Sequence, residues 1–146
     1  QENSEFQKAL DLCLNEYKNN KGVNILWRLA RSYFDLADQT SNDELKLENI
    51  DNGLPYAQKA LEVDSLSAKS NHWYAVIIGK KGVLEGTKQK IVNSYEVREY
   101  GLKAIELDPN YNNAYQIFLF GTTTGVVAQR FADTGVVVSI VVYSII

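Results

Sequence analysis

Apolar residues recur every three or four positions along most of the chain, and short polar stretches interrupt this pattern. Such spacing places apolar side chains on one face of an α-helix. Phe6, Leu10 and Tyr17 share one face and predict a helix over about residues 3–19. The next apolar stripe predicts a helix over about residues 23–37. The pattern as a whole predicts an all-α chain.

A third helix is expected to begin at residues 41–44, Ser-Asn-Asp-Glu. This sequence matches a capping box, in which the serine hydroxyl and the glutamate carboxylate satisfy each other's backbone N–H groups. Pro55 interrupts the segment between this box and Val63. Because proline suits the first turn of a helix far better than its interior, the segment corresponds either to two short helices or to one kinked helix.

Two more helices are expected before residue 110. Residues 66–78 predict the first of them, with Gly79 and Gly82 closing it. Residues 88–107 predict the second, which Asp108-Pro109 ends because proline cannot continue a helix.

Residues 56–65 and 100–109 are similar to each other at an offset of 44 positions. Both carry tyrosine, lysine, alanine, glutamate and aspartate at matching positions. The pattern resembles the second helix of a tetratricopeptide repeat, which precedes a helix with a packed aromatic residue. Trp27, Trp73 and Tyr115 occupy that aromatic position, at intervals of 46 and 42 residues, and both tryptophans are expected in the core.

The usual tetratricopeptide unit has about 34 residues, so each unit here carries about ten more, as a longer second helix or loop. We therefore expect an all-α, tetratricopeptide-like helical solenoid of antiparallel helix pairs with longer than standard repeat units. The expected single domain, residues 1–146, begins with an N-terminal helix. Its parts are that helix (3–22), repeat unit 1 (23–65), repeat unit 2 (66–109), and a partial third unit or C-terminal apolar cap (110–146).

The last twelve residues, 135–146, are dominated by valine and isoleucine. Propensity alone favours a strand, whereas packing against the last repeat favours a buried or self-associating helix, which is the interpretation preferred here. The 13 uncharged residues after Asp133 fall short of the roughly 20 that a helix needs to cross a bilayer. A complete transmembrane helix is therefore not expected unless the chain has been cut.

The overall composition is that of an ordinary soluble domain, with 45% hydrophobic residues, 23% charged residues and a net charge of −3. This net charge argues against a nucleic-acid partner. Cys13 is the only cysteine, which excludes an intrachain disulfide and favours reducing surroundings. The chain begins at Gln1 without a signal-peptide pattern, so we expect a fragment of a longer protein.

The chain also resembles the regulator of microtubule dynamics family. The most specific segments are Leu-Trp-Arg-Leu-Ala-Arg at residues 26–31 and Glu-Gly-x-Lys-x-Lys-Ile at residues 85–91. Further similarity lies in residues 56–61, 73–75 and 103–107. The resemblance spans roughly Ile25 to Tyr115 and stops after Gly121.

This resemblance implies a non-catalytic protein-interaction module of a microtubule-associated protein, with a role in spindle dynamics and chromosome segregation. The implied partners are tubulin and microtubules, and the implied location is the cytoplasm, on the cytoskeleton or spindle. The alternative is a lipid or apolar-ligand module at an organelle contact site, on the mitochondrial or reticulum surface. A membrane contact is thus left open, and no cofactor is implied.

Charge is unevenly distributed along the chain, with a net charge of −5 over residues 1–65 and of +3 over residues 66–107. In the basic segment five lysines outnumber a single glutamate between residues 69 and 90. These candidate residues for binding acidic tubulin tails are Lys69, Lys80, Lys81, Lys88 and Lys90. The alternative is that they form a solvated loop and helix start that aid solubility.

In a repeat solenoid the first helix of each pair lines a concave groove, which suits an extended or helical protein segment. The residues expected there are Arg28, Ser32, Asn71, Tyr74 and Ile78. Each of them could equally be ordinary surface or packing.

Catalytic chemistry finds no support in the sequence. His72 is the only histidine, and neither a triad nor a three-ligand metal site assembles around it. Cys13 lies on an apolar stripe, as a buried thiol would. We therefore expect no enzyme, no metal site and no catalytic residue.

Overall fold

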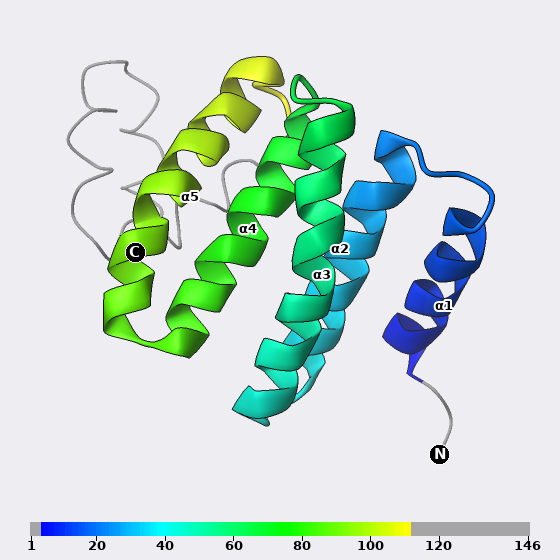
Figure 1. Cartoon of the computed structure of the whole chain (residues 1–146), viewed down its shortest axis with the longest axis horizontal. Coiled ribbons are helices and arrows are strands. Elements are labelled where there is room, and N and C mark those ends of the chain that lie inside the picture. Colours follow the sequence, from blue (N-terminus) through cyan, green and yellow to red (C-terminus); the bar gives the residue numbers. More distant parts are fainter. Residues whose placement is uncertain (1–3, 112–146) are drawn as a thin grey trace.

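A computed structural model describes residues 4–111, which form five helices and no strand. The helices follow one another in a row of antiparallel neighbours, with α1 at one end and α5 at the other (Figure 1). Their bounds are α1 (Glu5–Tyr17), α2 (Val23–Gln39), α3 (Asp43–Val63), α4 (Ala68–Glu85) and α5 (Thr87–Leu107). The predicted all-α class is confirmed. Tyr115 and almost all of the expected third unit or cap lie outside the described residues.

Each helix packs mainly on its neighbours in sequence, and α2 also packs on α4. The main core lies where α2, α3 and α4 meet, and it contains Leu26, Trp27, Ile50, Trp73 and Ile77. Both tryptophans are buried, as expected. A smaller cluster joins α1 to α2 through Leu10, Ile25 and Leu29. The row is thus held together by successive interfaces between neighbouring helices.

The third helix is capped by the second residue of the predicted capping box and not by the first. Asn42 is the N-cap of α3, and its Oδ1 accepts hydrogen bonds from the backbone N–H groups of Glu44 (2.9 Å) and Leu45 (3.2 Å). Ser41 lies outside the helix, so the capping box was wrong in detail. Asparagine caps helices as well as serine does, and here one side chain satisfies two N–H groups.

Pro55 lies inside α3, which is one continuous helix, so the alternative of two short helices is wrong. Pro55 removes the N–H group that would bond to the carbonyl of Asp51, four residues earlier. Both residues are exposed, so water can reach that carbonyl.

The expected end of the fourth helix at Gly79 and Gly82 was also wrong, because α4 continues to Glu85. A Cβ on Gly82 would lie 3.0 Å from the Cα of Lys90, and one on Gly79 would lie 3.3 Å from a methyl of Val97. These glycines therefore allow α4 and α5 to approach closely. The residue that ends the helix is Gly86, whose φ of 110° suits glycine.

The internal similarity corresponds to equivalent pieces of structure. α3 and α5 begin 44 residues apart and end 44 residues apart. Each is followed by an aspartate whose carboxylate accepts a hydrogen bond from the backbone N–H two residues on, at 3.0 Å for Asp64 and 3.1 Å for Asp108. The two similar segments therefore end helices of equal length, 21 residues each.

Gly53 provides a test of this packing. A Cβ on Gly53 would lie 2.9 Å from the Cβ of Tyr33 on α2. We predict that Gly53→Ala lowers the free energy of unfolding by about 1–2 kcal/mol, because overpacking outweighs the roughly 1 kcal/mol gained in helix propensity. Urea denaturation measures this change. Asn52→Ala, at an exposed neighbouring position, is the control, and equal stability of the two variants would contradict the close contact.

Candidate functional site

The structure divides the five candidate lysines into two kinds, and Lys80 and Lys81 belong to the first. The Nζ of Lys80 lies 3.0 Å from a carboxylate oxygen of Asp38 on α2. Lys81 bonds to Asp51 on α3 and to Glu85 on its own helix, and these bonds, that to Asp51 foremost, raise the pKa of its ammonium group. The side chains of the two lysines are only 17% and 23% exposed. They therefore tie α4 to α2 and α3 and present little free charge.

The remaining candidates, Lys69, Lys88 and Lys90, form no ion pair with any described residue. Lys88 and Lys90 lie at the start of α5, where Lys88 is exposed and Lys90 is half-buried. Lys69 lies at the opposite end of α4 from Lys80, about 16 Å away along the helix at 1.5 Å per residue. The five lysines therefore do not form one patch.

The residues expected in the groove also differ in their burial. Arg28 is exposed, whereas Ser32 is buried and donates a long hydrogen bond to the sulfur of Cys13 on α1 (3.9 Å). Asn71 is fully buried, and its side-chain nitrogen donates to the backbone carbonyls of Ser65 (3.0 Å) and Ser67 (2.9 Å). Ser32 and Asn71 therefore hold the fold together and line no groove.

Tyr74 and Ile78 face α5, which is the physical reason that the groove expectation fails for them too. The Tyr74 hydroxyl donates to a carboxylate oxygen of Glu96 (2.7 Å), and burial, with this bond, raises the pKa of the hydroxyl. Ile78 packs in a buried cluster with Val97. The sequence does not give the rotation of α4 relative to its neighbours, so these contacts were not predicted. Of the five residues, Arg28 is exposed and Tyr74 is half-buried.

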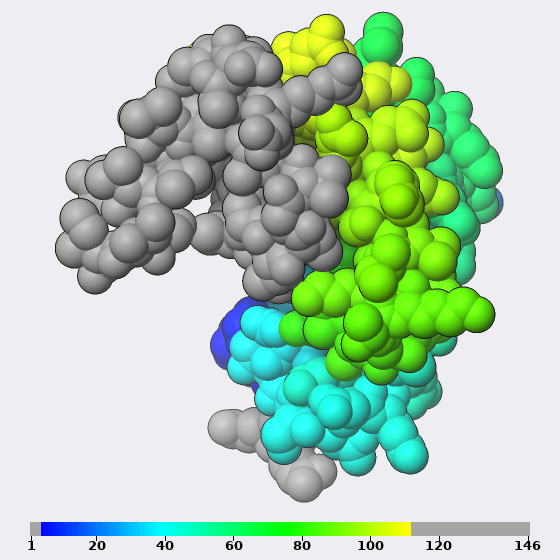
Figure 2. Space-filling view, turned by 90° about the vertical axis from the view of Figure 1, so that its left-hand side faces the viewer, coloured from blue at the N-terminus to red at the C-terminus, as the bar shows by residue number. Residues whose placement is uncertain are grey.

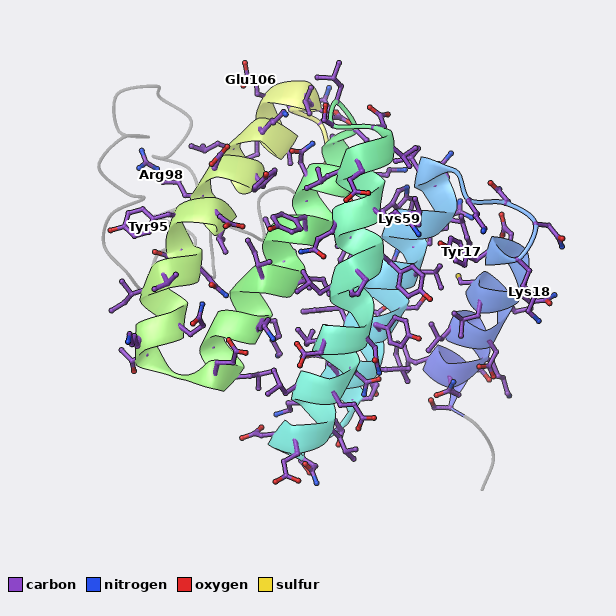
Figure 3. All side chains as sticks on the ribbon, viewed as in Figure 1. Tyr17, Lys18, Lys59, Tyr95, Arg98 and Glu106 are labelled. Atoms are coloured by element: carbon purple, nitrogen blue, oxygen red, sulfur yellow. The ribbon has the colours of Figure 1, made fainter. Side chains whose placement is uncertain are left out.

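Two other groups of side chains were missed in the sequence. On the outer side of α5, Ile91, Val92 and Tyr95 are exposed, and Tyr95 and Arg98 point away from the row (Figure 3). Part of α5 is visible at the surface on this side of the molecule (Figure 2). An irregular helical pattern concealed this stripe, since α5 carries apolar residues on more than one face.

The second missed group joins α1 to α3. The Nζ of Lys59 donates to the hydroxyl of Tyr17 at 3.3 Å (Figure 3). Tyr56 packs edge-on against the Tyr17 ring, at a centroid distance of 5.4 Å. Lys21 lies 5.8 Å from the centroid of the same ring. Because Lys59 and Tyr17 lie 42 positions apart, no local motif reveals their contact.

His72 is buried between the rings of Trp73 and Tyr111, at centroid distances of 5.0 and 5.2 Å. Burial lowers the pKa of its imidazole to about 4, so the side chain is neutral at pH 7. Its Nδ1 has no hydrogen-bond partner among the described residues. Among residues 4–111, no three histidine, cysteine or carboxylate side chains gather as a metal site would require. Within the same range, none of the helices has the length and apolar composition of a membrane span.

Comparison with known proteins gives one family. A family model described as regulator of microtubule dynamics protein 1-3 matches residues 1–121. The chain is 39% identical over 129 residues to regulator of microtubule dynamics protein 1 of Bos taurus, an alignment that covers 88% of this chain and 40% of that protein.

Two further relatives agree. The human regulator of microtubule dynamics protein 1 is 43% identical over 97 residues, covering 65% of this chain and 30% of that protein. Regulator of microtubule dynamics protein 3 of Rattus norvegicus is 38% identical over 104 residues, covering 70% and 22%. The chain therefore spans 40% or less of the length of these curated relatives.

The neutral, buried His72 predicts a specific loss of stability in acid. Its pKa is about 4 in the folded protein and about 6.5 when unfolded, so the unfolded state binds more protons between these values. Stability is then complete above pH 6.5 and falls as the pH drops toward 4. We expect a loss of about 2 kcal/mol between pH 7 and pH 5 from this residue.

Urea denaturation of the wild-type protein, His72→Phe and His72→Gln at both pH values tests the prediction. Either folded variant should lose about 2 kcal/mol less than the wild type over this range, because neither new side chain titrates. Equal losses in all three proteins would show that His72 does not carry the effect.

Proposed function

The chain belongs to the regulator of microtubule dynamics family, and from this membership we propose that its helices form a non-catalytic protein-interaction module with a role in microtubule dynamics. The resemblance seen in residues 26–31 and 85–91 is thereby confirmed as family membership. Direct binding to microtubules, the spindle location and a role in chromosome segregation are parts of the proposal. These three features would concern the whole protein, whereas this chain spans only a minor part of the length of its relative.

We also propose that the row of helices is a tetratricopeptide-like solenoid, with residues 23–65 and 66–109 as successive repeat units. The observation that supports it is the 44-residue spacing of α3 and α5, together with the matching aspartates after them. Proteins of this kind stack repeats and use the resulting surfaces to bind other proteins.

The outer side of α5 is the surface that best fits a microtubule contact. Lys88 and Lys90 lie in or near the first turn of α5, where a positive charge opposes the helix dipole and so lowers the stability of the helix. These charges therefore do not stabilise the fold, but they would attract an acidic partner. The exposed Ile91 and Tyr95 follow on the same helix and supply apolar contact area.

Co-sedimentation with microtubules across a salt series tests the proposal. We expect binding by the wild-type protein that weakens as ionic strength rises, because exposed charges are screened. Lys88→Gln/Lys90→Gln should weaken binding about fivefold, which corresponds to roughly 0.5 kcal/mol for each charge removed. The substitutions should not lower stability, since they remove charges that oppose the helix dipole.

Lys8→Gln/Lys46→Gln is the matched control, because it removes the same charge from two lysines that pair with carboxylates on their own helices. This variant should bind like the wild type. Equal weakening by both double variants would exclude the start of α5 as the contact. Absence of wild-type binding would contradict the proposed microtubule role of this module.

A further inference from the structure

Two positive side chains from different helices lie over one tryptophan. The guanidinium carbon of Arg28 on α2 is 5.4 Å from the ring centroid of Trp27, and the Nζ of Lys69 on α4 is 4.9 Å from it. Trp27 is 8% exposed, and its indole N–H donates to the Oδ1 of Asn24 (3.2 Å). The ring is therefore a fixed platform between the first turns of α2 and α4.

The charges of Arg28 and Lys69 have no counterpart in the described part of the chain. Neither side chain is in an ion pair with a described residue, and both are exposed. Their contact with the same ring keeps the two cations within about 10 Å of each other, where like charges repel. A cation–π contact at an exposed site, worth about 0.5–1 kcal/mol, offsets this repulsion but leaves both positive charges in place. The pair is thus suited to bind an anionic group.

The rest of this face shows where such an anion can lie. Arg31 follows Arg28 by one turn, lies 5.8 Å from the ring centroid of Trp73, and pairs with Asp35 at 3.4 Å. Asp38 comes one turn later and binds Lys80 of α4. Positive charge is therefore in excess only where α2 and α4 begin, and the face becomes neutral or acidic toward their other ends.

We propose that Arg28 and Lys69, held over Trp27, bind the carboxylates of an acidic protein segment that lies across the N-terminal ends of α2 and α4. The arginine fork can hold one carboxylate through two hydrogen bonds, and the lysine can pair with a neighbouring one. Exclusion of water by the segment strengthens both ion pairs and both cation–π contacts.

A short acidic segment fits this surface better than an anionic membrane does. A bilayer would cover the whole face and bring its charge against the carboxylates of Asp35 and Asp38. A peptide can end before it reaches them. The net charge of −3 likewise gives the chain no general attraction to an anionic surface.

Fluorescence anisotropy of a labelled hexaglutamate peptide tests the site directly, with labelled hexaglutamine as the uncharged probe. We expect the wild-type protein to bind hexaglutamate and not hexaglutamine. Arg28→Gln and Lys69→Gln should each weaken binding about three- to tenfold, in the range of single charged contacts. Arg28→Lys should lose part of the affinity, since it keeps the charge but not the planar fork.

Lys8→Gln/Lys46→Gln is again the control, and it should leave the affinity unchanged. Circular dichroism at 222 nm shows whether each variant keeps its helices, as expected for exposed helix positions. Equal weakening by the control variant, or no binding of hexaglutamate to the wild type, would overturn the proposal. So would binding to vesicles with 30% phosphatidylserine that exceeds binding to the peptide and depends on Arg28 and Lys69.

The site rests on the proposed role of the chain as an interaction module, but its test can fail separately. Lys88→Gln/Lys90→Gln should keep its affinity for hexaglutamate, because those lysines lie at the far end of α4 from Lys69. Loss of microtubule binding with retained peptide binding would contradict only the α5 contact. Retained microtubule binding without peptide binding would contradict only the site at Trp27.

Discussion

Close approach of neighbouring helices at small residues is the constraint on which the rest of the structure depends. Gly53 lets α3 lie against Tyr33 and the Ala30 carbonyl of α2, and Gly82 lets α5 lie against α4. Elsewhere at these seams alanines such as Ala57 and Ala104 are completely buried. With the backbones this close, the large side chains gather where three helices meet, and Trp27 and Trp73 reach the edge of the core. That position leaves their rings accessible to cations from α2 and α4.

The same packing decides which charges remain free. Lys80 meets Asp38 across 42 positions of sequence, and Lys81 meets Asp51 across 30. The basic middle of the chain is thereby folded against its acidic first half, and much of the charge imbalance between these segments disappears. The described cations that form no ion pair include Arg28 and Lys69 over Trp27 and Lys88 and Lys90 at the start of α5. The distribution of free charge is a property of the fold and differs from the distribution along the sequence.

Sequence reasoning located the helices well and the surfaces poorly, and the reasons are physical. The bounds of α1, α2 and α5 lie within two residues of those expected, because strong periodicity and clear stop signals mark them. Gly79 and Gly82 were wrongly predicted to end the helix. Glycine can either end a helix or let a neighbouring helix approach closely, and only tertiary contacts distinguish the two roles. Asn71 and Ile78 were expected in a groove but are buried, because burial depends on the rotation of α4 relative to α5. Arg28 and Lys69 were both noticed, yet their meeting over one ring depends on the parallel alignment of two helices that are not adjacent in sequence.

The row of helices also determines how the protein responds to force and thermal motion. Contacts concentrate between consecutive helices, and α2 and α4 share a much smaller interface than either has with α3. Such an arrangement bends more readily than it stretches, because bending changes mainly the weaker α2–α4 interface while the stronger neighbouring interfaces persist. Arg28 and Lys69 sit on opposite sides of that interface, so curvature of the row sets the width between them. Bending of the row would therefore change the spacing of this charged pair.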